Sequence, residues 1–454
     1  MAQLDDVGDW VRRRLPELLR EHAVPAASVA IGWGDETVAA AAGVLNRATG
    51  VEATTDAIFQ IGSVTKTWTA TLVLQLAEEG LLDLDAPIRA SLPGFRVADE
   101  RASATVTARH LLCHVAGFEG DVFTDTGKGD DCVERYVALL ADTPQLFPPG
   151  ELFSYNNAGF CVLGRLVEVL RGKPYDACLR DHLVAPLGLS HVACDPYDAV
   201  LFRVAVGHPT DEPTDVWALA RSNAPAGSML AMRATDLISF ARMHLSDGMG
   251  PGGDRVLNAR TVAAMQEPQV DQPPTGHGTS WGLGWELWQL PTGRVVGHDG
   301  NTIGQSASLR IAPDHDLAVA VLSNGGEQRL LHDEIVATVL RDLAGIELPR
   351  PTEPDPDRAV PDPQRVVGTY ESVVARTVVT ADADGRVWLD RTPLGVLAEI
   401  GEPAYRTELV GGPDDTVLPV TGEGGVHAPI AFLGDDGHGR AAYLHTGRAD
   451  RRVE

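Results

Sequence analysis

Residues 61–68 read Ile-Gly-Ser-Val-Thr-Lys-Thr-Trp, and an apolar helical pattern over residues 72–76 follows them directly. Ser63 is therefore expected at or just before a helix N-terminus, with Lys66 three positions later on the same face. A serine hydroxyl is a weak nucleophile at neutral pH and needs a base within hydrogen-bond reach. A lysine becomes such a base when burial or a nearby cation lowers its pKa. The pattern predicts a serine nucleophile with a lysine base; the alternative is an N-capping serine beside a surface lysine.

A second motif carries groups that suit the same chemistry. Tyr155 and Asn157 follow a Pro-Pro-Gly turn and precede a helical pattern. The Tyr155 phenol offers a proton relay, and the Asn157 amide offers a partner for a substrate carbonyl or for Lys66. The alternative is a turn in which Asn156 or Asn157 caps the next helix.

The third motif, Gly297-His298-Asp299-Gly300-Asn301, stands before a predicted strand over 306–311. Glycines such as Gly300 let the backbone approach a ligand, and a strand-edge N–H there would complete an oxyanion hole with that of Ser63. The alternative is a plain hairpin turn at Asp299-Gly300.

These motifs together resemble the penicillin-binding-protein and class C β-lactamase superfamily of serine acyl enzymes. The chain has the three motifs in the order and rough spacing of that family: Ser63-x-x-Lys66, Tyr155-x-Asn157 and His298-x-Gly300. Four supporting strings also look like the family, at residues 111–117, 149–155, 186–189 and 225–227. The resemblance covers roughly residues 8–345.

The resemblance implies a covalent cycle. Ser63, deprotonated by Lys66 with help from Tyr155, would attack an ester, thioester or amide carbonyl. The backbone N–H groups of Ser63 and Asn301 would hold the oxyanion, and Asn157 would orient the substrate amide. The acyl-Ser63 would then pass to water or to an amine.

Two departures from the family narrow the expected chemistry. The third motif is H-D-G where β-lactamases usually carry K-T-G, so His298, mostly neutral at pH 7, replaces the usual cation for an antibiotic carboxylate. We therefore expect no efficient β-lactamase activity. The first ten residues lack a basic n-region and an apolar h-region, which predicts a cytoplasmic protein and argues against D,D-peptidase work on peptidoglycan.

Among the remaining relatives, the chain most resembles the penicillin-binding-protein-type thioesterases of nonribosomal peptide pathways. These release a peptidyl thioester by head-to-tail macrocyclisation or hydrolysis, and a carrier protein can present the substrate. An arginine near their C-terminus is thought to reach the site; Arg448 is the positional candidate here, with a surface arginine as the alternative. The rival enzyme is a general esterase or D-amino-acid peptide or amide hydrolase. The non-enzymatic alternative is a catalytically silent homologue that binds ligands.

Composition limits the partners. The 454 residues carry 37 Lys and Arg against 63 Asp and Glu, a formal net charge of −26. A protein with this net negative charge repels nucleic acid and anionic membrane surfaces. No segment of the sequence approaches the roughly 20 apolar residues of a membrane helix. The five cysteines show no CxxC spacing, so neither a disulfide framework nor a zinc site is predicted. We expect no cofactor and no metal.

The chain divides at residues 349–363, which hold six prolines and predict an extended linker. Residues 1–348 are expected to form an α/β (α+β) domain of the β-lactamase/D,D-peptidase type, an antiparallel sheet of five or more strands flanked by helices. Residues 364–454 predict a small all-β barrel, which the resemblance makes lipocalin-like.

Three weaker patterns in the sequence indicate structural roles. The polar stretch 121–131 reads as an exposed acidic loop near the cleft rather than a cation loop. His110 and His114 have the i, i+4 spacing that metal sites use, but His114 falls inside a family structural string. Trp281 is expected in the core or in a pocket wall.

Overall fold

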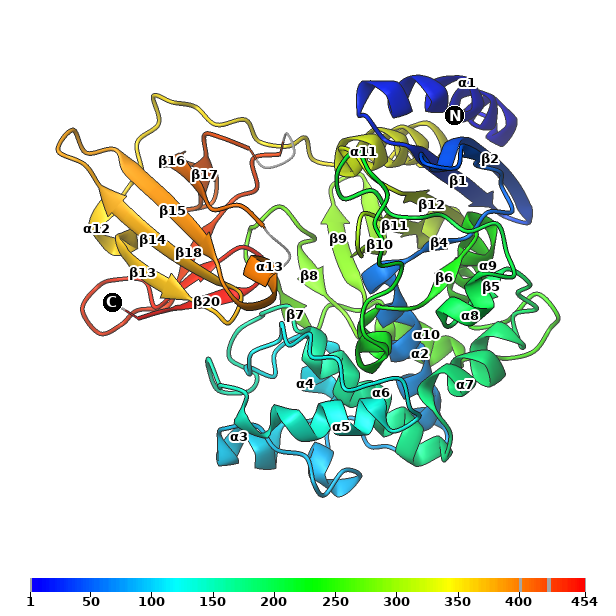
Figure 1. Ribbon diagram of the computed structural model, residues 1–454, viewed down its shortest axis with the longest axis horizontal. Coiled ribbons are helices and arrows are strands. Elements are labelled where there is room, and N and C mark those ends of the chain that lie inside the picture. Colours follow the sequence, from blue (N-terminus) through cyan, green and yellow to red (C-terminus); the bar gives the residue numbers. More distant parts are fainter. Residues whose placement is uncertain (1, 400–401, 423–425, 454) are drawn as a thin grey trace.

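The computed structural model describes residues 2–399, 402–422 and 426–453 and shows a large α/β region beside a smaller all-β region (Figure 1). A nine-stranded antiparallel sheet, in the order β3-β2-β1-β12-β11-β10-β9-β8-β7, forms the centre of the α/β region. It confirms the expected sheet built from distant segments. Its strands are β1 (Ala26–Trp33), β2 (Glu36–Asn46), β3 (Val51–Glu52), β7 (Val270–Asp271), β8 (Ser280–Trp281), β9 (Glu286–Leu290), β10 (Gly293–Asn301), β11 (Ser306–Ala312) and β12 (Leu317–Ser323).

Helices cover both faces of this sheet. On one face lie α1 (Leu4–Glu21) and α11 (Gln328–Val339). The apolar side chains of α1 recur every three or four residues, and Leu15 and Leu18 are buried in one cluster with Val319 of β12. Burial of each such leucine contributes about 1.5–3 kcal/mol. This layer fixes the sheet from the side that faces away from Ser63.

The other face carries the helical part of the region, with α2 (Thr65–Glu78) at its centre. Every residue of α2 from Thr65 to Leu76 is buried, because neighbours surround the helix on all sides. A short sheet of β4 (Phe59–Gln60), β6 (Ala231–Met232) and β5 (Val192–Ala193) lies beside it. The other helices are α3 (Glu100–Thr105), α4 (Ala108–Leu112), α5 (Cys132–Leu139), α6 (Asn157–Arg171), α7 (Tyr175–Leu179), α8 (Pro196–Ala199), α9 (Ala234–Leu245) and α10 (Ala259–Met265).

The C-terminal region is a nearly closed all-β barrel, as the sequence predicts. Its strand order is β17-β16-β15-β14-β13-β20-β19-β18, and a bridge between Val417 and Ile430 joins the two ends. Tyr370, Leu389 and Leu444 lie in its core. No helix or strand occupies residues 349–362, and α12 (Pro363–Val366) and α13 (Gly395–Glu399) accompany the strands. The strands are β13 (Gly368–Glu371), β14 (Ala375–Ala381), β15 (Val387–Pro393), β16 (Tyr405–Gly411), β17 (Val417–Pro419), β18 (Ala431–Leu433), β19 (Tyr443–His445) and β20 (Ala449–Arg452).

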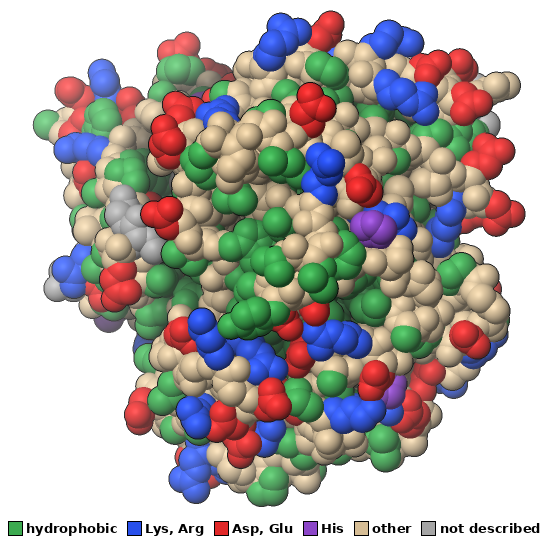
Figure 2. Space-filling model, turned by 45° about the vertical axis from the view of Figure 1, so that its right-hand side comes forward, with side chains coloured by type: hydrophobic (Ala, Val, Ile, Leu, Met, Phe, Trp, Pro, Cys, Tyr) green, Lys and Arg blue, Asp and Glu red, His purple; other side chains and the backbone are tan. Residues whose placement is uncertain are grey.

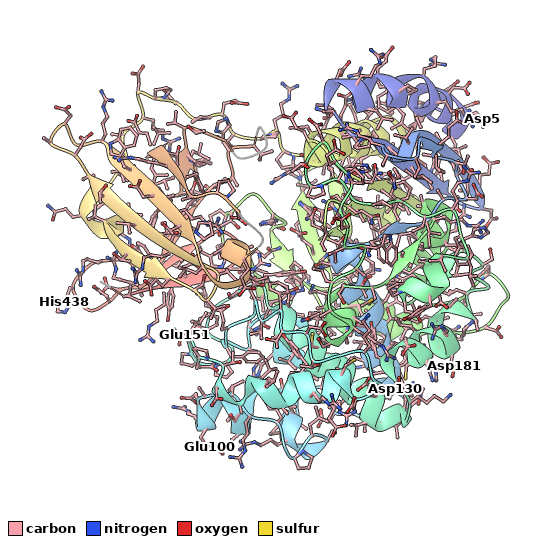
Figure 3. All side chains as sticks on the ribbon, viewed as in Figure 1. Asp5, Glu100, Asp130, Glu151, Asp181 and His438 are labelled. Carbon is pink, nitrogen blue, oxygen red and sulfur yellow. The ribbon has the colours of Figure 1, made fainter. Side chains whose placement is uncertain are left out.

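Acidic side chains are distributed over the surface and do not form a single patch in the segments named here. Asp5, Glu100, Asp130 and Asp181 project outward from separate parts of the chain (Figure 3). One face gathers hydrophobic side chains near its middle, with charged side chains around them (Figure 2). Within the described part of the chain, no helix combines the length and the apolar character that a membrane crossing requires.

Candidate active site

Ser63 lies in a single 3-10 turn, Gly62–Val64, that leads directly into α2. Lys66 Nζ lies 2.9 Å from Ser63 Oγ and donates to the Ala226 carbonyl at 2.7 Å. The Lys66 side chain is fully buried, so the surface-lysine alternative is wrong. The structure therefore places an amine directly beside the serine hydroxyl, as the sequence spacing predicts.

Burial lowers the pKa of Lys66 to about 7. Arg448 lowers this pKa further, whereas Cys161 and Asp121 raise it. Desolvation disfavours the ammonium form because the buried charge loses its hydration. The lowered pKa increases the proportion of Lys66 that is a free amine at neutral pH, the form that accepts a proton from Ser63.

Tyr155 completes the polar centre from the segment before α6. Lys66 Nζ lies 4.8 Å from the centroid of the Tyr155 ring. Burial raises the pKa of Tyr155 well above its usual range, and its hydroxyl has no hydrogen-bond partner among the described residues. The phenol therefore stays protonated at neutral pH. This protonation state makes Lys66 the stronger candidate for the base and leaves Tyr155 as a proton relay.

His114 holds the Tyr155 segment on one side. Its backbone carbonyl accepts from Ser154 N at 2.9 Å, and its Nδ1 accepts from Asn156 N at 2.9 Å. The His114 and Tyr155 rings stack with centroids 4.3 Å apart. Burial lowers the pKa of His114 well below its ordinary value, so the ring stays neutral and Nδ1 remains an acceptor. The sequence did not predict the contact between His114 and the Tyr155 segment, because His114 lies in residues 111–117, which looked only like a structural motif of the family.

The two asparagines after Tyr155 have separate roles. Asn156 caps α6, since its side chain accepts from Gly159 N at 2.7 Å. Asn157 is the first residue of α6, and its Nδ2 donates to Asp121 Oδ1 at 2.7 Å. The capping alternative is thus right for Asn156, while Asn157 belongs to the polar network of the site.

The third motif lies inside β10 rather than in a turn. The hairpin turn falls at residues 302–305, where Thr302 N donates to the Gln305 carbonyl at 2.9 Å. The hairpin interpretation of Asp299-Gly300 is therefore wrong, since the reversal uses Gly304 at φ +66°. Antiparallel pairs alternate in hydrogen bonding, so the N–H of Asn301 points away from β11. The strand edge that it faces is open, because pairing with β9 ends at Gly297.

Glycines bring that open edge against Ser63. A Cβ on Gly300 would lie 2.7 Å from Ser63 N, and one on Gly62 would lie 2.5 Å from Asn301 N. A Cβ on Gly227 would lie 2.9 Å from Ser63 N. Side chains at these three positions would separate the two amides, so the glycines allow an oxyanion hole made from Ser63 and Asn301.

His298 is buried in the wall of the site. Its ring lies 5.4 Å from Trp281 and 6.1 Å from Tyr155, centroid to centroid. Burial lowers the pKa of His298 to about 3, and nearby Lys66 adds to the effect. The side chain is therefore neutral at pH 7 and presents no cation, as the sequence predicts. Among the described residues, its Nε2 has no hydrogen-bond partner.

Arg448 reaches the site from the C-terminal barrel. Its guanidinium carbon lies 5.0 Å from the centroid of the Tyr155 ring, and Nε lies 2.5 Å from Asp121 Oδ2. The Arg448 side chain is 42% exposed, whereas that of Asp121 is 7% exposed. The prediction of an exposed acidic loop is wrong at Asp121, because this carboxylate is buried between Arg448 and Asn157. Asp121 is thus a site residue that sequence reasoning missed.

Potential metal ligands gather elsewhere. Within the described ranges, the one such group is Glu21, His22 and Glu334. Arg14 pairs with Glu21 at 2.7 Å and with Glu334 at 2.9 Å, so the two acids already form an ion-pair network. All five cysteines are buried and unpaired.

Comparison with known proteins identifies the family. The sequence model of the beta-lactamase family matches residues 11–339, which include Ser63, Lys66, Tyr155 and His298. The chain belongs to the beta-lactamase family. The match confirms the resemblance seen in the motifs.

Relatives within the beta-lactamase family extend the likeness. Penicillin-binding protein 4 of Amycolatopsis lactamdurans is 42% identical over 81% of this chain and 98% of its own length. Esterase EstB of Burkholderia gladioli is 32% identical over 63% of this chain and 78% of its own length. A crystal structure of SurE with D-Leu is 31% identical, with a TM-score of 0.78, and covers 99% of this chain and 100% of that chain. This beta-lactamase-family protein is a serine hydrolase or acyltransferase.

Proposed function

We propose that this protein releases acyl or peptidyl chains from thioesters, passing them through acyl-Ser63 to an amine of the same chain or to water. Head-to-tail macrocyclisation of a nonribosomal peptide presented on a carrier protein is the specific form of this reaction. The observation that carries the proposal is the buried Lys66 amine, 2.9 Å from Ser63 Oγ with its pKa lowered to about 7.

Acylation follows from the placement of these groups. Ser63 Oγ attacks the thioester carbonyl carbon while its proton passes to the free amine of Lys66. The N–H groups of Ser63 and Asn301 donate to the oxygen that becomes negative. The carbon–sulfur bond then breaks, and the leaving thiolate takes the proton from Lys66 directly or through Tyr155. The products are acyl-Ser63 and a free thiol.

Deacylation reverses the proton movements. A neutral amine or a water molecule attacks the ester carbonyl and gives a proton to Lys66. The bond between the carbonyl carbon and Ser63 Oγ breaks, and Oγ recovers that proton. An amine from the far end of the same peptide yields a cyclic amide, whereas water yields a linear acid.

Two observations support a peptidyl thioester over a simple ester. The C-terminal barrel places Arg448 beside Tyr155, where a cation can hold a carbonyl or carboxylate of a long substrate. The likeness to SurE extends through that barrel over 99% of this chain, and a SurE structure contains D-Leu.

A synthetic peptidyl thioester with a free N-terminal amine and a D-residue at the thioester end tests the proposal. We expect a product that equals the substrate minus its thiol, which is the cyclic peptide. Linear acid is heavier than this product by one water, so mass spectrometry separates the two. Ser63→Ala is the control and should form neither product nor acyl-enzyme. Product formation that survives in Ser63→Ala contradicts the proposal.

The alternative is a general esterase or D-amino-acid peptide or amide hydrolase. The sequence identity between this chain and Esterase EstB favours this alternative. Turnover of short esters beside an untouched peptidyl thioester would decide for this alternative.

A further inference from the structure

A short turn of the C-terminal barrel touches the backbone that carries Tyr155. The turn joins β19 to β20, and Thr446 N donates to the Arg448 carbonyl at 3.1 Å. Gly447 has φ +99°, and its N–H donates to His445 Nδ1 at 3.1 Å. His445 therefore fixes the turn from within.

Three hydrogen bonds join this turn to residues 153–155. His445 Nε2 lies 2.8 Å from the Phe153 carbonyl. Tyr155 N donates to the Gly447 carbonyl at 3.0 Å, and Ala449 N donates to Ser154 Oγ at 3.1 Å. The Tyr155 segment is thus held between His114 on one side and the barrel on the other.

The hydrogen-bond pattern defines the tautomer of His445. Because Nδ1 accepts from Gly447, the ring proton is on Nε2 and donates to Phe153. His445 is fully buried, and burial lowers its pKa to about 4. One neutral ring consequently bridges the two regions of the protein at neutral pH.

We infer that His445 is a positioning residue for Tyr155: it holds the turn at residues 445–449 so that the Gly447 carbonyl fixes the Tyr155 backbone and Arg448 lies over the Tyr155 ring. The inference rests on the proposed role of Tyr155 in the acylation of Ser63. The His445 ring bonds to Phe153 and Gly447 and, among the described residues, to neither Ser63 nor Lys66, so it acts through Tyr155.

Three substitutions separate the two bonds of the ring. His445→Gln places an amide N–H where Nε2 stands and keeps the bond to Phe153. His445→Asn places an amide oxygen where Nδ1 stands and keeps only the bond within the turn. His445→Leu removes both bonds at similar volume. His427→Leu is the matched control, because His427 lies in the same barrel and its Nδ1 lies 2.8 Å from the Pro419 carbonyl oxygen, not from a residue of the 153–157 segment.

Hydrogen exchange tests the clamp without relying on catalysis. In His445→Leu, we expect faster amide exchange in peptides that cover residues 153–157 and unchanged exchange in the core of the α/β region. His427→Leu should leave residues 153–157 as protected as in the wild type. Unchanged exchange over 153–157 in His445→Leu overturns the inference.

Acylation by p-nitrophenyl butyrate tests the catalytic consequence. A misplacement of about 1 Å reduces the rate on the order of 100-fold, so we expect a loss of that size in the acylation rate constant of His445→Leu, with the dissociation constant of the ester nearly unchanged. His445→Gln should recover more of this rate than His445→Asn. Combined with Tyr155→Phe, His445→Leu should cause little further loss, because both changes act through one side chain.

The outcomes separate the two claims. Fully multiplicative losses in the double variant overturn the positioning role of His445. If His445→Leu fails to fold, equal rates in His445→Gln and His445→Asn overturn that role. A wild-type enzyme that forms no adduct on Ser63 overturns the proposed function, and the exchange experiment then still decides whether His445 holds the Tyr155 segment.

Discussion

Replacement of Lys66 by methionine should remove activity and yet stabilise the protein in weakly acidic solution. The Lys66 side chain is fully buried, and its pKa falls from 10.5 to about 7 on folding. The folded state therefore binds fewer protons than the unfolded state between these two values, and the wild type gains stability as pH rises through that window. Methionine has a similar length and carries no charge.

The magnitude follows from the pKa shift. Because the pKa of Lys66 falls from 10.5 to about 7 and each pKa unit corresponds to about 1.36 kcal/mol, charged Lys66 destabilises the fold by up to about 5 kcal/mol below pH 7. Loss of the hydrogen bond to the Ala226 carbonyl offsets about 1 kcal/mol of the gain in the variant. We therefore expect Lys66→Met to exceed the wild type by about 3–4 kcal/mol at pH 6, and this advantage to shrink by about 2–3 kcal/mol at pH 9.

Urea unfolding of both proteins at pH 6 and pH 9 measures this difference. Other titrating groups cancel between the two proteins, so the change in the difference belongs to Lys66. A stability difference that does not vary with pH would refute the reasoning. So would a variant that is less stable than the wild type at pH 6.

Three further predictions concern the rate of acylation. In the wild type, kcat/KM should rise with pH to a plateau with a midpoint near 7, because the free amine of Lys66 is the reactive form; a flat profile from pH 5 to 9 would contradict this. The two charges beside Lys66 should move that midpoint in opposite directions. Asp121→Asn should shift it to lower pH and Arg448→Gln to higher pH, so a shift of the same sign in both would exclude the electrostatic explanation. Gly300→Ala should lower kcat about 100- to 1,000-fold by displacing the oxyanion edge. Its matched control, Gly94→Ala, has no atom within 4 Å of the new Cβ and should retain full activity.

The catalytic motifs and the fold were accessible from the sequence because both depend on local patterns. The helix after Ser63, the spacing to Lys66 and the alternating apolar residues of β11 and β12 are properties of short segments. The antiparallel sheet and the C-terminal barrel follow from the same patterns. The sequence does not show how deeply each segment is buried. The Lys66 side chain is buried by contacts with Ala226, with the Tyr155 ring and with Phe160 of α6, which come from three separate segments.

The two wrong predictions, for residues 121–131 and for Asp299-Gly300, arise because the sequence does not show how deeply a segment is buried. Residues 121–131 are polar, and composition alone places them on the surface; Asp121 is buried because Arg448 and Asn157 satisfy its charge and hydrogen bonds. Asp299-Gly300 has the composition of a turn, but Asp299 forms a bidentate ion pair with Arg310 at 2.7 and 2.8 Å and continues the strand. In both cases a partner outside the local segment, Arg448 for Asp121 and Arg310 on the neighbouring strand for Asp299, overrides the local preference.

The contact between the barrel and the Tyr155 segment also has a consequence for biosynthesis. Ala449 and Ser154, which it joins, are 295 positions apart in the chain. Chains are made from the N-terminus, and domains fold largely in that order during synthesis. Ser63, Lys66 and Tyr155 therefore leave the ribosome long before the turn that holds Tyr155. If the turn at residues 445–449 positions Tyr155 as we infer, a chain that is interrupted or cleaved before this turn should acylate Ser63 more slowly than the intact chain.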